Sequence, residues 1–249
     1  MTITTIRMGI FYLDTEFTNG NYYLGDIFEI ALLSENSGRI FHSYVNIPSR
    51  IPRYIKKMCN VTDARIWKSP PFCKVMNELI GFIEREDKEA SSKRAFIIAH
   101  GGYLNDFPLL LTNCMRTKYD YTLLEKYTFI DSKLVFESNG YKRPGLDALS
   151  GKGDRRIHSA IEDVKLARDV IKNLLVIDIT TTNTYAYTLQ DILQYVEGKL
   201  PISIQNIYKI AAQETSYYSF ESELYRHAVT KTALNENQVR KIAYRYFNR

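Results

Sequence analysis

Residues 9–20 read GIFYLDTEFTNG, and the interpretation of the fold begins with this stretch. The apolar run Ile10–Leu13 predicts a buried strand. Two carboxylates, Asp14 and Glu16, follow this run with one residue between them. Because residues i and i+2 of a regular strand share a face, both carboxylates can point in one direction. Acidic residues are unusual at the end of a buried strand, so their role depends on whether further carboxylates occur elsewhere in the chain.

The length and composition indicate a globular protein. A chain of 249 residues with 45% hydrophobic content suits one substantial domain and a small second one. No apolar run approaches the roughly 20 residues that a membrane helix needs, and the N-terminal MTITTIRMG lacks the apolar core of a secretory signal. Three separated cysteines form no CxxC pair, which argues against a zinc site or a disulfide framework. We therefore expect an intracellular protein, cytoplasmic or nuclear, that is not secreted and binds no membrane.

The formal net charge of +5 is unevenly distributed along the chain. Residues 39–74 carry eight basic residues against a single acid, Asp63. A basic segment of this kind often binds phosphate, although a solvated surface is the alternative interpretation. Most of the 19 tyrosines are expected to be half-buried packing residues, and a few can stack on bases.

Strands and helices alternate along the first 178 residues. Hydrophobic periodicity predicts strands at 9–17, 26–34, 39–47, 95–100 and 127–131, and helices at 72–86, 103–114 and 158–175. The turn at 34–38 joins the second and third strands as a hairpin, so the sheet begins with three antiparallel strands. Either Ser132 or Asp131 is expected to cap the helix that follows the last strand. This order predicts an α/β domain with a mixed sheet and flanking helices, spanning residues 1–178.

The remaining residues form a different region. The stretch TTTNT at 180–184 reads as a polar joint. Residues 185–249 predict helices near 188–197, 203–213, 219–230 and 235–247, with no strand and no chemical motif. We expect a small helical region of unknown role that offers a surface for a protein or nucleic-acid partner.

Two further acids accompany Asp14 and Glu16. Asp106 follows a buried strand in AHGGYLNDFPLLL, and Asp163 lies in HSAIEDV, five residues after His158. Four clustered carboxylates repel one another unless cations neutralise them, and oxygen ligands select Mg²⁺ or Mn²⁺. Two such ions about 3.5–4 Å apart can cleave a phosphodiester. A neutral imidazole, here that of His158, can accept the proton of the attacking water.

At these residues the sequence resembles the DnaQ-like, or DEDDh, family of 3′–5′ exonucleases. The resemblance covers roughly residues 8–176 and rests on DxE in the first strand, an Asp after a strand that ends in AH, and H-x4-D on a late helix. The stretch IPRYIKKMCNVTDARIWKSPPF is similar to the helix-turn segment of the family. The spacing in HGGYLNDFPLL is most similar to the three-prime repair (TREX-type) branch. The resemblance implies a ribonuclease H-like fold.

The resemblance also implies roles for individual residues. Metal binding is assigned to Asp14, Glu16, Asp106 and Asp163, which would hold two Mg²⁺ or Mn²⁺ ions, and the general base is assigned to His158. Phe17 and Thr18 would contact the terminal nucleotide, and Tyr103 is a further candidate beside the site.

The sequence also departs from the family pattern. Gly101 stands where the family often has Asn, which leaves the contact of that Asn with the substrate in doubt. A T-G-L turn is missing after the first strand, so the wedge against the last base would come from Tyr22, Tyr23 or Leu24. His100 and His42 are expected to have structural roles.

The expected function is that of a metal-dependent 3′–5′ exonuclease. It would act on 3′ ends of nucleic acid and release nucleoside 5′-monophosphates, with single strands preferred and DNA slightly favoured over RNA. Two alternatives remain open from the sequence. One is a nucleic-acid-binding module with an exonuclease fold, and the other is a proofreading subunit of a polymerase complex.

Overall fold

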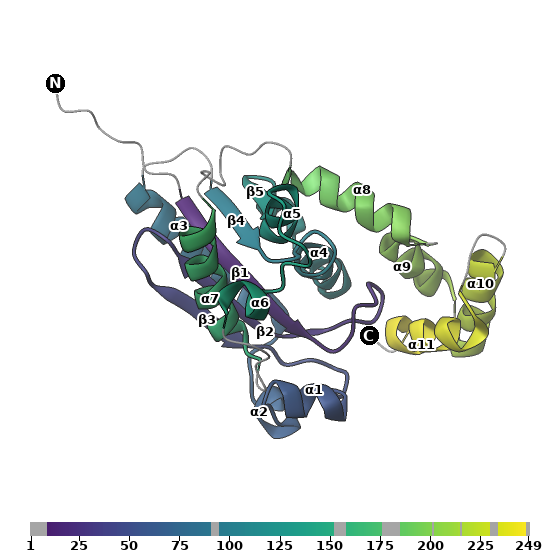
Figure 1. Cartoon of the computed structure of the whole chain (residues 1–249). Helices are drawn as coiled ribbons and strands as arrows, with labels where there is room; N and C mark the ends of the chain where they lie inside the picture. Colours follow the sequence, from purple (N-terminus) through teal and green to yellow (C-terminus); the bar gives the residue numbers. More distant parts are fainter. Residues whose placement is uncertain are drawn as a thin grey trace.

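A mixed sheet forms the centre of the protein in the computed structural model, which describes residues 9–90, 95–151, 158–175, 185–200, 202–214, 216–229 and 234–247. Within these residues the sheet has six strands in the order β3-β2-β1-β4-β5-β6 (Figure 1). The strands are β1 (Gly9–Phe17), β2 (Ile27–Ser34), β3 (Ile40–Tyr44), β4 (Ala95–Ala99), β5 (Tyr127–Asp131) and β6 (Ala186–Tyr187). β2 pairs antiparallel with β1 and β3, whereas β4 pairs parallel with β1 and β5. The predicted antiparallel start and mixed sheet are therefore confirmed.

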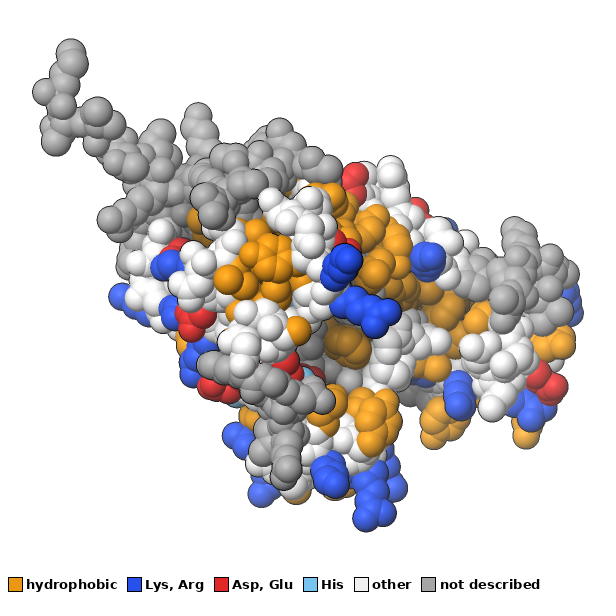
Figure 2. Space-filling view, viewed as in Figure 1, with side chains coloured by type: hydrophobic (Ala, Val, Ile, Leu, Met, Phe, Trp, Pro, Cys, Tyr) orange, Lys and Arg blue, Asp and Glu red, His pale blue; other side chains and the backbone are white. Residues whose placement is uncertain are grey.

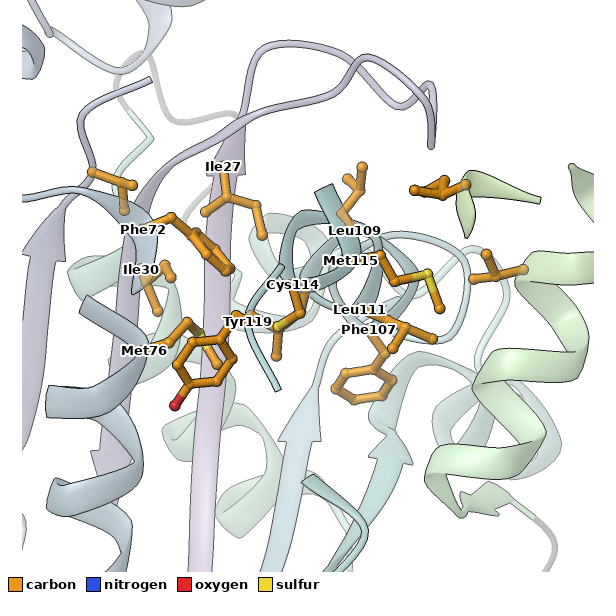
Figure 3. Packing of buried hydrophobic residues seen from close by; sticks show 14 of the residues in the cluster. Ile27, Ile30, Phe72, Met76, Phe107, Leu109, Leu111, Cys114, Met115 and Tyr119 are labelled. Atoms are coloured by element: carbon orange, nitrogen blue, oxygen red, sulfur yellow. The ribbon is translucent and has the colours of Figure 1, made fainter. Parts of the chain in front are cut away.

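Helices cover both faces of this sheet. Those of the first part of the chain are α1 (Arg53–Met58), α2 (Asp63–Trp67), α3 (Phe72–Ala90), α4 (Asp106–Thr117), the 3₁₀-helix η1 (Tyr121–Leu124), α5 (Ser132–Ser138), α6 (Leu146–Ser150) and α7 (Ala160–Leu174). Phe11 and Leu13 of β1 pack with α3 and α4, whereas Tyr12 packs with α5 and α7 on the opposite face. Figure 3 shows the first of these layers, in which residues of α3 and α4 lie around Ile27 and Ile30 of β2. The period-2 alternation of β1 thus assigns even-numbered residues to the face of α7.

The start of α4 differs from the prediction by three residues. The helix was expected from Tyr103, but residues 100–105 form turns and α4 begins at Asp106. A β-carbon at Gly102 would lie 2.6 Å from the Ala99 side chain and 2.8 Å from the Phe107 ring, so this turn is too tight for any side chain. The turn is closed by amides that donate to Asp131, from Gly101 at 2.9 Å and from Tyr103 at 3.0 Å.

Asp131 also caps the helix that follows it. Its side chain accepts hydrogen bonds from the backbone amides of Lys133 and Leu134, while Ser132 is the first residue of α5. Of the two predicted caps, Asp131 is therefore correct and Ser132 is wrong. One buried carboxylate holds both the turn before α4 and the start of α5, which fixes the edge of the sheet where β4 and β5 end.

The C-terminal region contains α8 (Leu189–Lys199), α9 (Ile204–Gln213), α10 (Tyr217–Val229) and α11 (Glu236–Phe247). The four predicted helices are confirmed, but the expectation of no strand is wrong. β6 pairs antiparallel with β5 through Tyr187 opposite Phe129 and Ala186 opposite Ile130. Two residues are too few to show alternation, so the sequence could not reveal this strand. The predicted joint at 180–184 lies outside the described residues.

The core continues without a break into these C-terminal helices. Apolar residues of α8, α9 and α11 belong to the same buried cluster as Phe11 of β1 and Phe107 of α4. None of the described helices combines the length and the apolar character that a membrane crossing requires.

The loop between β1 and β2 is held by α4 and by the C-terminal region. Asp26 is 3% exposed and forms ion pairs with Arg116 of α4 and Arg245 of α11. Arg245 also donates to the carbonyl of Leu24 at 2.6 Å. The hydroxyl of Tyr23 donates to the Ile202 carbonyl at 2.6 Å and accepts from the Ile202 amide at 2.9 Å. The C-terminal helices therefore fix the segment that directly follows the acidic end of β1.

Removing Arg245 should destabilise the whole protein. Arg245→Ala leaves the buried Asp26 carboxylate with less compensating charge, and breaking one partner of a buried pair costs about 3–5 kcal/mol. Arg240→Ala is the matched control, because this arginine is 61% exposed and its ion pairs lie at the surface of α11. Urea unfolding should show a loss within about 1 kcal/mol for the control. Equal losses for both variants would contradict this account of the docking.

Candidate active site

Three carboxylates converge at the end of β1. Asp14 and Glu16 lie on the β1 face that meets α7, and Asp163 lies in the first turn of α7. One oxygen from each carboxylate lies within 4.8 Å of the others. These three residues are called the carboxylate cluster. The expectation that positions i and i+2 of the strand would act together with the late helix is met by this geometry.

The electrostatics of the cluster are unfavourable without cations. Burial raises the pKa of the Asp14 carboxyl well above its ordinary value, and the charges of Asp106 and Asp163 raise it further. For Glu16, burial raises the pKa to about 7 against the lowering effect of a hydrogen bond from Cys59. The group consists of carboxylates alone, which is the ligand set that hard divalent cations such as Mg²⁺ and Mn²⁺ prefer. The residues present therefore fit a divalent-metal site.

Asp106 lies beside the cluster but is turned to another partner. Its Oδ1 accepts hydrogen bonds from the Thr15 amide at 3.0 Å and from the Thr15 hydroxyl at 2.7 Å. Thr15 is an odd-numbered position and faces α4, whereas Asp14 and Glu16 face α7. Burial raises the pKa of Asp106 to about 6, and the hydrogen bonds from Thr15 oppose this shift. The structure thus brings three of the four predicted acids together, and Thr15, the residue after Asp14 on β1, holds Asp106 beside them.

His158 lies at the rim of the cluster, as predicted. It precedes α7, and its amide donates to the Met58 carbonyl at 3.0 Å. Its Nδ1 lies 3.7 Å from Oδ2 of Asp163, and the side chain is 31% exposed. The imidazole is thus next to the carboxylates and open to solvent, which suits a group that accepts a proton from water.

A fifth acid, Glu29, was missed by the sequence analysis. It lies opposite Glu16 in the β1–β2 register and is 1% exposed. Its Oε1 lies 2.9 Å from Nε2 of His42 on β3, so His42 has a partner that the sequence did not indicate. The signal was a single acid inside the otherwise apolar IFEIALLS. A charged residue in a strand that is buried on both faces requires a partner nearby.

The α1–α2 segment reaches the cluster through two adjacent residues. The thiol of Cys59 donates to Oε2 of Glu16 at 3.3 Å, and the preceding residue, Met58, binds His158 through its carbonyl. The family resemblance implied a helix-turn segment here, and α1 and α2 are its two helices. The end of α1 thus lies against both the acids and the histidine.

Of the predicted substrate contacts, Phe17 and Thr18 lie where β1 ends. A register shift in the β1–β2 pairing falls between Glu16 and Phe17, and Phe17 is partly buried against the core. Thr18 is 2% exposed, and both its amide and its hydroxyl are bonded to the backbone of Asp26. The Thr18 side chain is therefore used inside the protein, while Phe17 stays a predicted contact.

Aromatic residues of the C-terminal region cover Tyr103. The Tyr103 ring stacks on Tyr187 with centroids 4.1 Å apart and lies 4.8 Å from the Tyr195 ring. Tyr22, one of the three wedge candidates, donates to the Leu104 carbonyl at 2.8 Å. Tyr23 is 3% exposed, so this residue is excluded as the wedge.

Gly101 and His100 have structural explanations. Gly101 adopts a positive φ of 79°, which glycine adopts most readily and Asn tolerates better than most other residues. The backbone conformation thus accounts for the occurrence of either residue at this position. His100 bonds locally to Ser132 at 3.0 Å and to the Pro144 carbonyl at 2.5 Å, as expected for a structural histidine.

Comparison with known proteins supports an exonuclease. A family model described as "Exonuclease" (RNase_T) matches residues 11–171, which is more than half of the 249 residues and includes the whole carboxylate cluster. The chain belongs to this exonuclease family. A comparison with curated protein sequences gives no match.

Solved structures share the fold of this exonuclease family member. The nuclease domain of 3′hExo, a DEDDh family member bound to rAMP, aligns with a TM-score of 0.54 at 20% identity, over 66% of this chain and 90% of that one. A 3′-exonuclease that recognises the 3′ end of the histone mRNA stem-loop aligns with a TM-score of 0.55 at 18% identity, over 74% and 86%. A full-length 3′-exonuclease gives 0.53 at 21%, over 67% and 60%. At these identities the likeness establishes the ribonuclease H-like fold.

Without metal, the stability of the fold should fall as pH rises through the pKa of Glu16. The pKa of Glu16 rises from 4.5 to about 7 in the metal-free fold, so this fold retains a proton that the unfolded chain releases. The resulting stabilisation is fully present below about pH 4.5 and is lost as pH rises through about 7. Between pH 5 and 8 in EDTA, the melting temperature of the wild type should therefore fall by a few degrees more than that of Glu16→Gln.

Adding Mn²⁺ should reverse this trend, because protons and metal compete for the same oxygens. Differential scanning fluorimetry should show a larger Mn²⁺-induced rise at pH 8 than at pH 5, and little rise in Glu16→Gln. A rise of equal size at both pH values would contradict metal binding by these carboxylates.

Proposed function

We propose that the protein is a divalent-metal-dependent 3′–5′ exonuclease that releases nucleoside 5′-monophosphates from single-stranded ends. The observation that carries this proposal is the carboxylate cluster, with three oxygens within 4.8 Å and His158 at its rim. Membership of the exonuclease family supports hydrolysis of a phosphodiester as the reaction.

Each residue has a distinct part in the proposed reaction. Asp14, Glu16 and Asp163 would hold Mg²⁺ or Mn²⁺, and Asp106, beside Asp14, would supply a further carboxylate. Two such ions, when bound, supply the Lewis acidity that activates a water and stabilises the leaving oxygen. His158 accepts the proton of that water as its oxygen attacks phosphorus, and the bond to the 3′ oxygen of the preceding nucleotide breaks. Phe17 and Tyr103 border the site where the terminal nucleotide would lie.

The family branch, the preference for DNA over RNA and the division into two regions belong to the same proposal. Asp106 follows His100 by six residues and precedes Phe-Pro-Leu-Leu, which supports the three-prime repair (TREX-type) branch and a slight preference for DNA. The aligned structures involve rAMP and an mRNA stem-loop, which makes RNA the necessary comparison. We assign the catalytic role to residues 1–178 and leave 185–249 as a helical region that supports it.

Degradation of labelled strands tests the reaction. A 5′-labelled single strand with Mg²⁺ should shorten stepwise from its 3′ end, and EDTA should abolish this. Asp163→Asn should lower the rate at least about a thousandfold, because several kcal/mol of transition-state stabilisation are lost. Asp169→Asn is the matched control on the same helix, since Asp169 is 52% exposed and pairs only with its neighbour Arg168 among the ion pairs of the described residues. Matched DNA and RNA strands should be compared side by side. Shortening that continues in EDTA would refute the metal-dependent mechanism.

His158→Gln separates proton transfer from metal binding. Loss of a general base lowers rates by about 100- to 10,000-fold. The Mn²⁺-induced rise in melting temperature should remain, because the three carboxylates of the cluster are unchanged. A variant that loses metal binding as well would show that His158 acts as a ligand and not as the base.

A further inference from the structure

The positive charge of the protein is concentrated in one segment. Residues 50–74, called the α1–α2 lobe, contain seven basic residues and one acid, Asp63. The rest of the chain carries 26 basic and 27 acidic residues, so the net charge of +5 comes from this lobe. Figure 2 shows blue side chains gathered at the lower end of the molecule, over α1 and α2, with orange side chains among them. Such a field attracts a polyanion.

Most of these cations are available to a ligand. Lys56 is held by Asp63 at 2.7 Å, and the guanidinium of Arg65 lies 4.3 Å from the Tyr44 ring centroid. The other five are exposed, and none forms an ion pair with a described residue: Arg50, Arg53, Lys57, Lys68 and Lys74.

Large apolar side chains lie exposed on the same lobe. Tyr54 is 68% exposed, Trp67 58% and Met58 37%. Exposed apolar side chains that gather on one part of a surface can mark a binding site. Aromatic faces interleaved with Lys and Arg are the surface on which single-stranded nucleic acid binds, since every base can stack and every phosphate can pair.

The lobe is continuous with the candidate active site. Met58 and Cys59 at the end of α1 contact His158 and Glu16, at 3.0 Å and 3.3 Å. A nucleic-acid strand whose 3′ end lies in the carboxylate cluster can therefore continue onto α1 and α2. An acidic protein surface, as the alternative ligand, would pair with the basic residues of the lobe but would leave its flat aromatic rings without stacking partners.

We propose that the α1–α2 lobe binds single-stranded nucleic acid upstream of the bond that is cleaved, with Tyr54 and Trp67 stacking on bases and Lys57 and Lys68 binding phosphates. This inference rests on the exonuclease function proposed above, and it names the part of the substrate that lies outside the carboxylate cluster. Longer strands should consequently bind more tightly than mononucleotides.

Trp67 provides a direct probe because it is the only tryptophan in the chain. In EDTA, where no cleavage occurs, a ten-nucleotide oligo(dT) or oligo(U) should quench its fluorescence in a saturable way. Inorganic polyphosphate tests charge without bases, and it should compete at low salt but leave the fluorescence nearly unchanged. Equal quenching by polyphosphate, or none by either oligonucleotide, would overturn the stacking assignment.

Substitutions on the lobe give an independent measurement. Tyr54→Ala should raise the dissociation constant of the oligonucleotide roughly tenfold, as expected for loss of one stacked base. Lys57→Ala and Lys68→Ala should each lower the salt slope of binding by about 0.7. The matched controls are Tyr218→Ala, at a tyrosine 81% exposed on α10, and Lys209→Ala, at an exposed lysine on α9. Lobe variants that bind like these controls would overturn the proposal.

A small substrate separates this inference from the function on which it rests. The p-nitrophenyl ester of thymidine 5′-monophosphate is too short to reach the lobe, so Tyr54→Ala should leave its hydrolysis unchanged while raising KM for a ten-nucleotide strand. If the wild type hydrolyses neither substrate but oligonucleotides quench Trp67, the exonuclease function fails and the lobe assignment stands. If strands are degraded and lobe variants behave as wild type, the lobe assignment fails alone.

Discussion

Repulsion among three carboxylates, one buried and two half-buried, is the constraint on which the rest of the structure depends. One oxygen from each of Asp14, Glu16 and Asp163 lies within 4.8 Å of the others, and desolvation followed by the charges of neighbouring acids raises the pKa values of Asp14 and Glu16. A folded chain tolerates such an arrangement only if protons or cations neutralise it. The surrounding contacts are consistent with this constraint: Thr15 donates twice to Asp106, and Cys59 donates to Glu16. β1 therefore ends in a group of carboxylates that is stable when protons or cations neutralise its charge.

The sequence was sufficient for the features that follow from periodicity. The alternation in β1, the apolar run of β4 and the spacing of α7 predicted the mixed sheet, and the acids at their ends predicted the cluster. What it could not supply were contacts between distant segments. Glu29 reads as an isolated acid until the register places it opposite Glu16. Thr18 reads as a substrate contact until the structure shows that its amide donates to the Asp26 carbonyl and its hydroxyl accepts from the Asp26 amide. The two residues of β6 carry no pattern at all, because pairing with β5 alone makes them a strand.

The residues matched by the exonuclease family and the C-terminal helices share one hydrophobic core. The residues matched by the exonuclease family end at 171, yet the buried apolar cluster extends to Tyr246. Tyr187 stacks on Tyr103, the tilted ring of Tyr195 lies against Tyr103, and Arg245 pairs with Asp26. The helical region thus packs against Tyr103 and the loop after β1, whereas the α1–α2 lobe contacts His158 and Glu16 through Met58 and Cys59.

The pairing of Asp26 with Arg245 has a consequence for the timing of folding. The two residues are separated by 219 positions, so the loop after β1 waits for its partner throughout most of synthesis. At about 5–20 residues per second this delay is roughly ten to forty seconds. Until then a desolvated aspartate, a buried tyrosine and the acidic end of a strand lack their final support. The loop after β1 can therefore take its final form only once α11 has been made, which is later than the synthesis of all three acids of the carboxylate cluster.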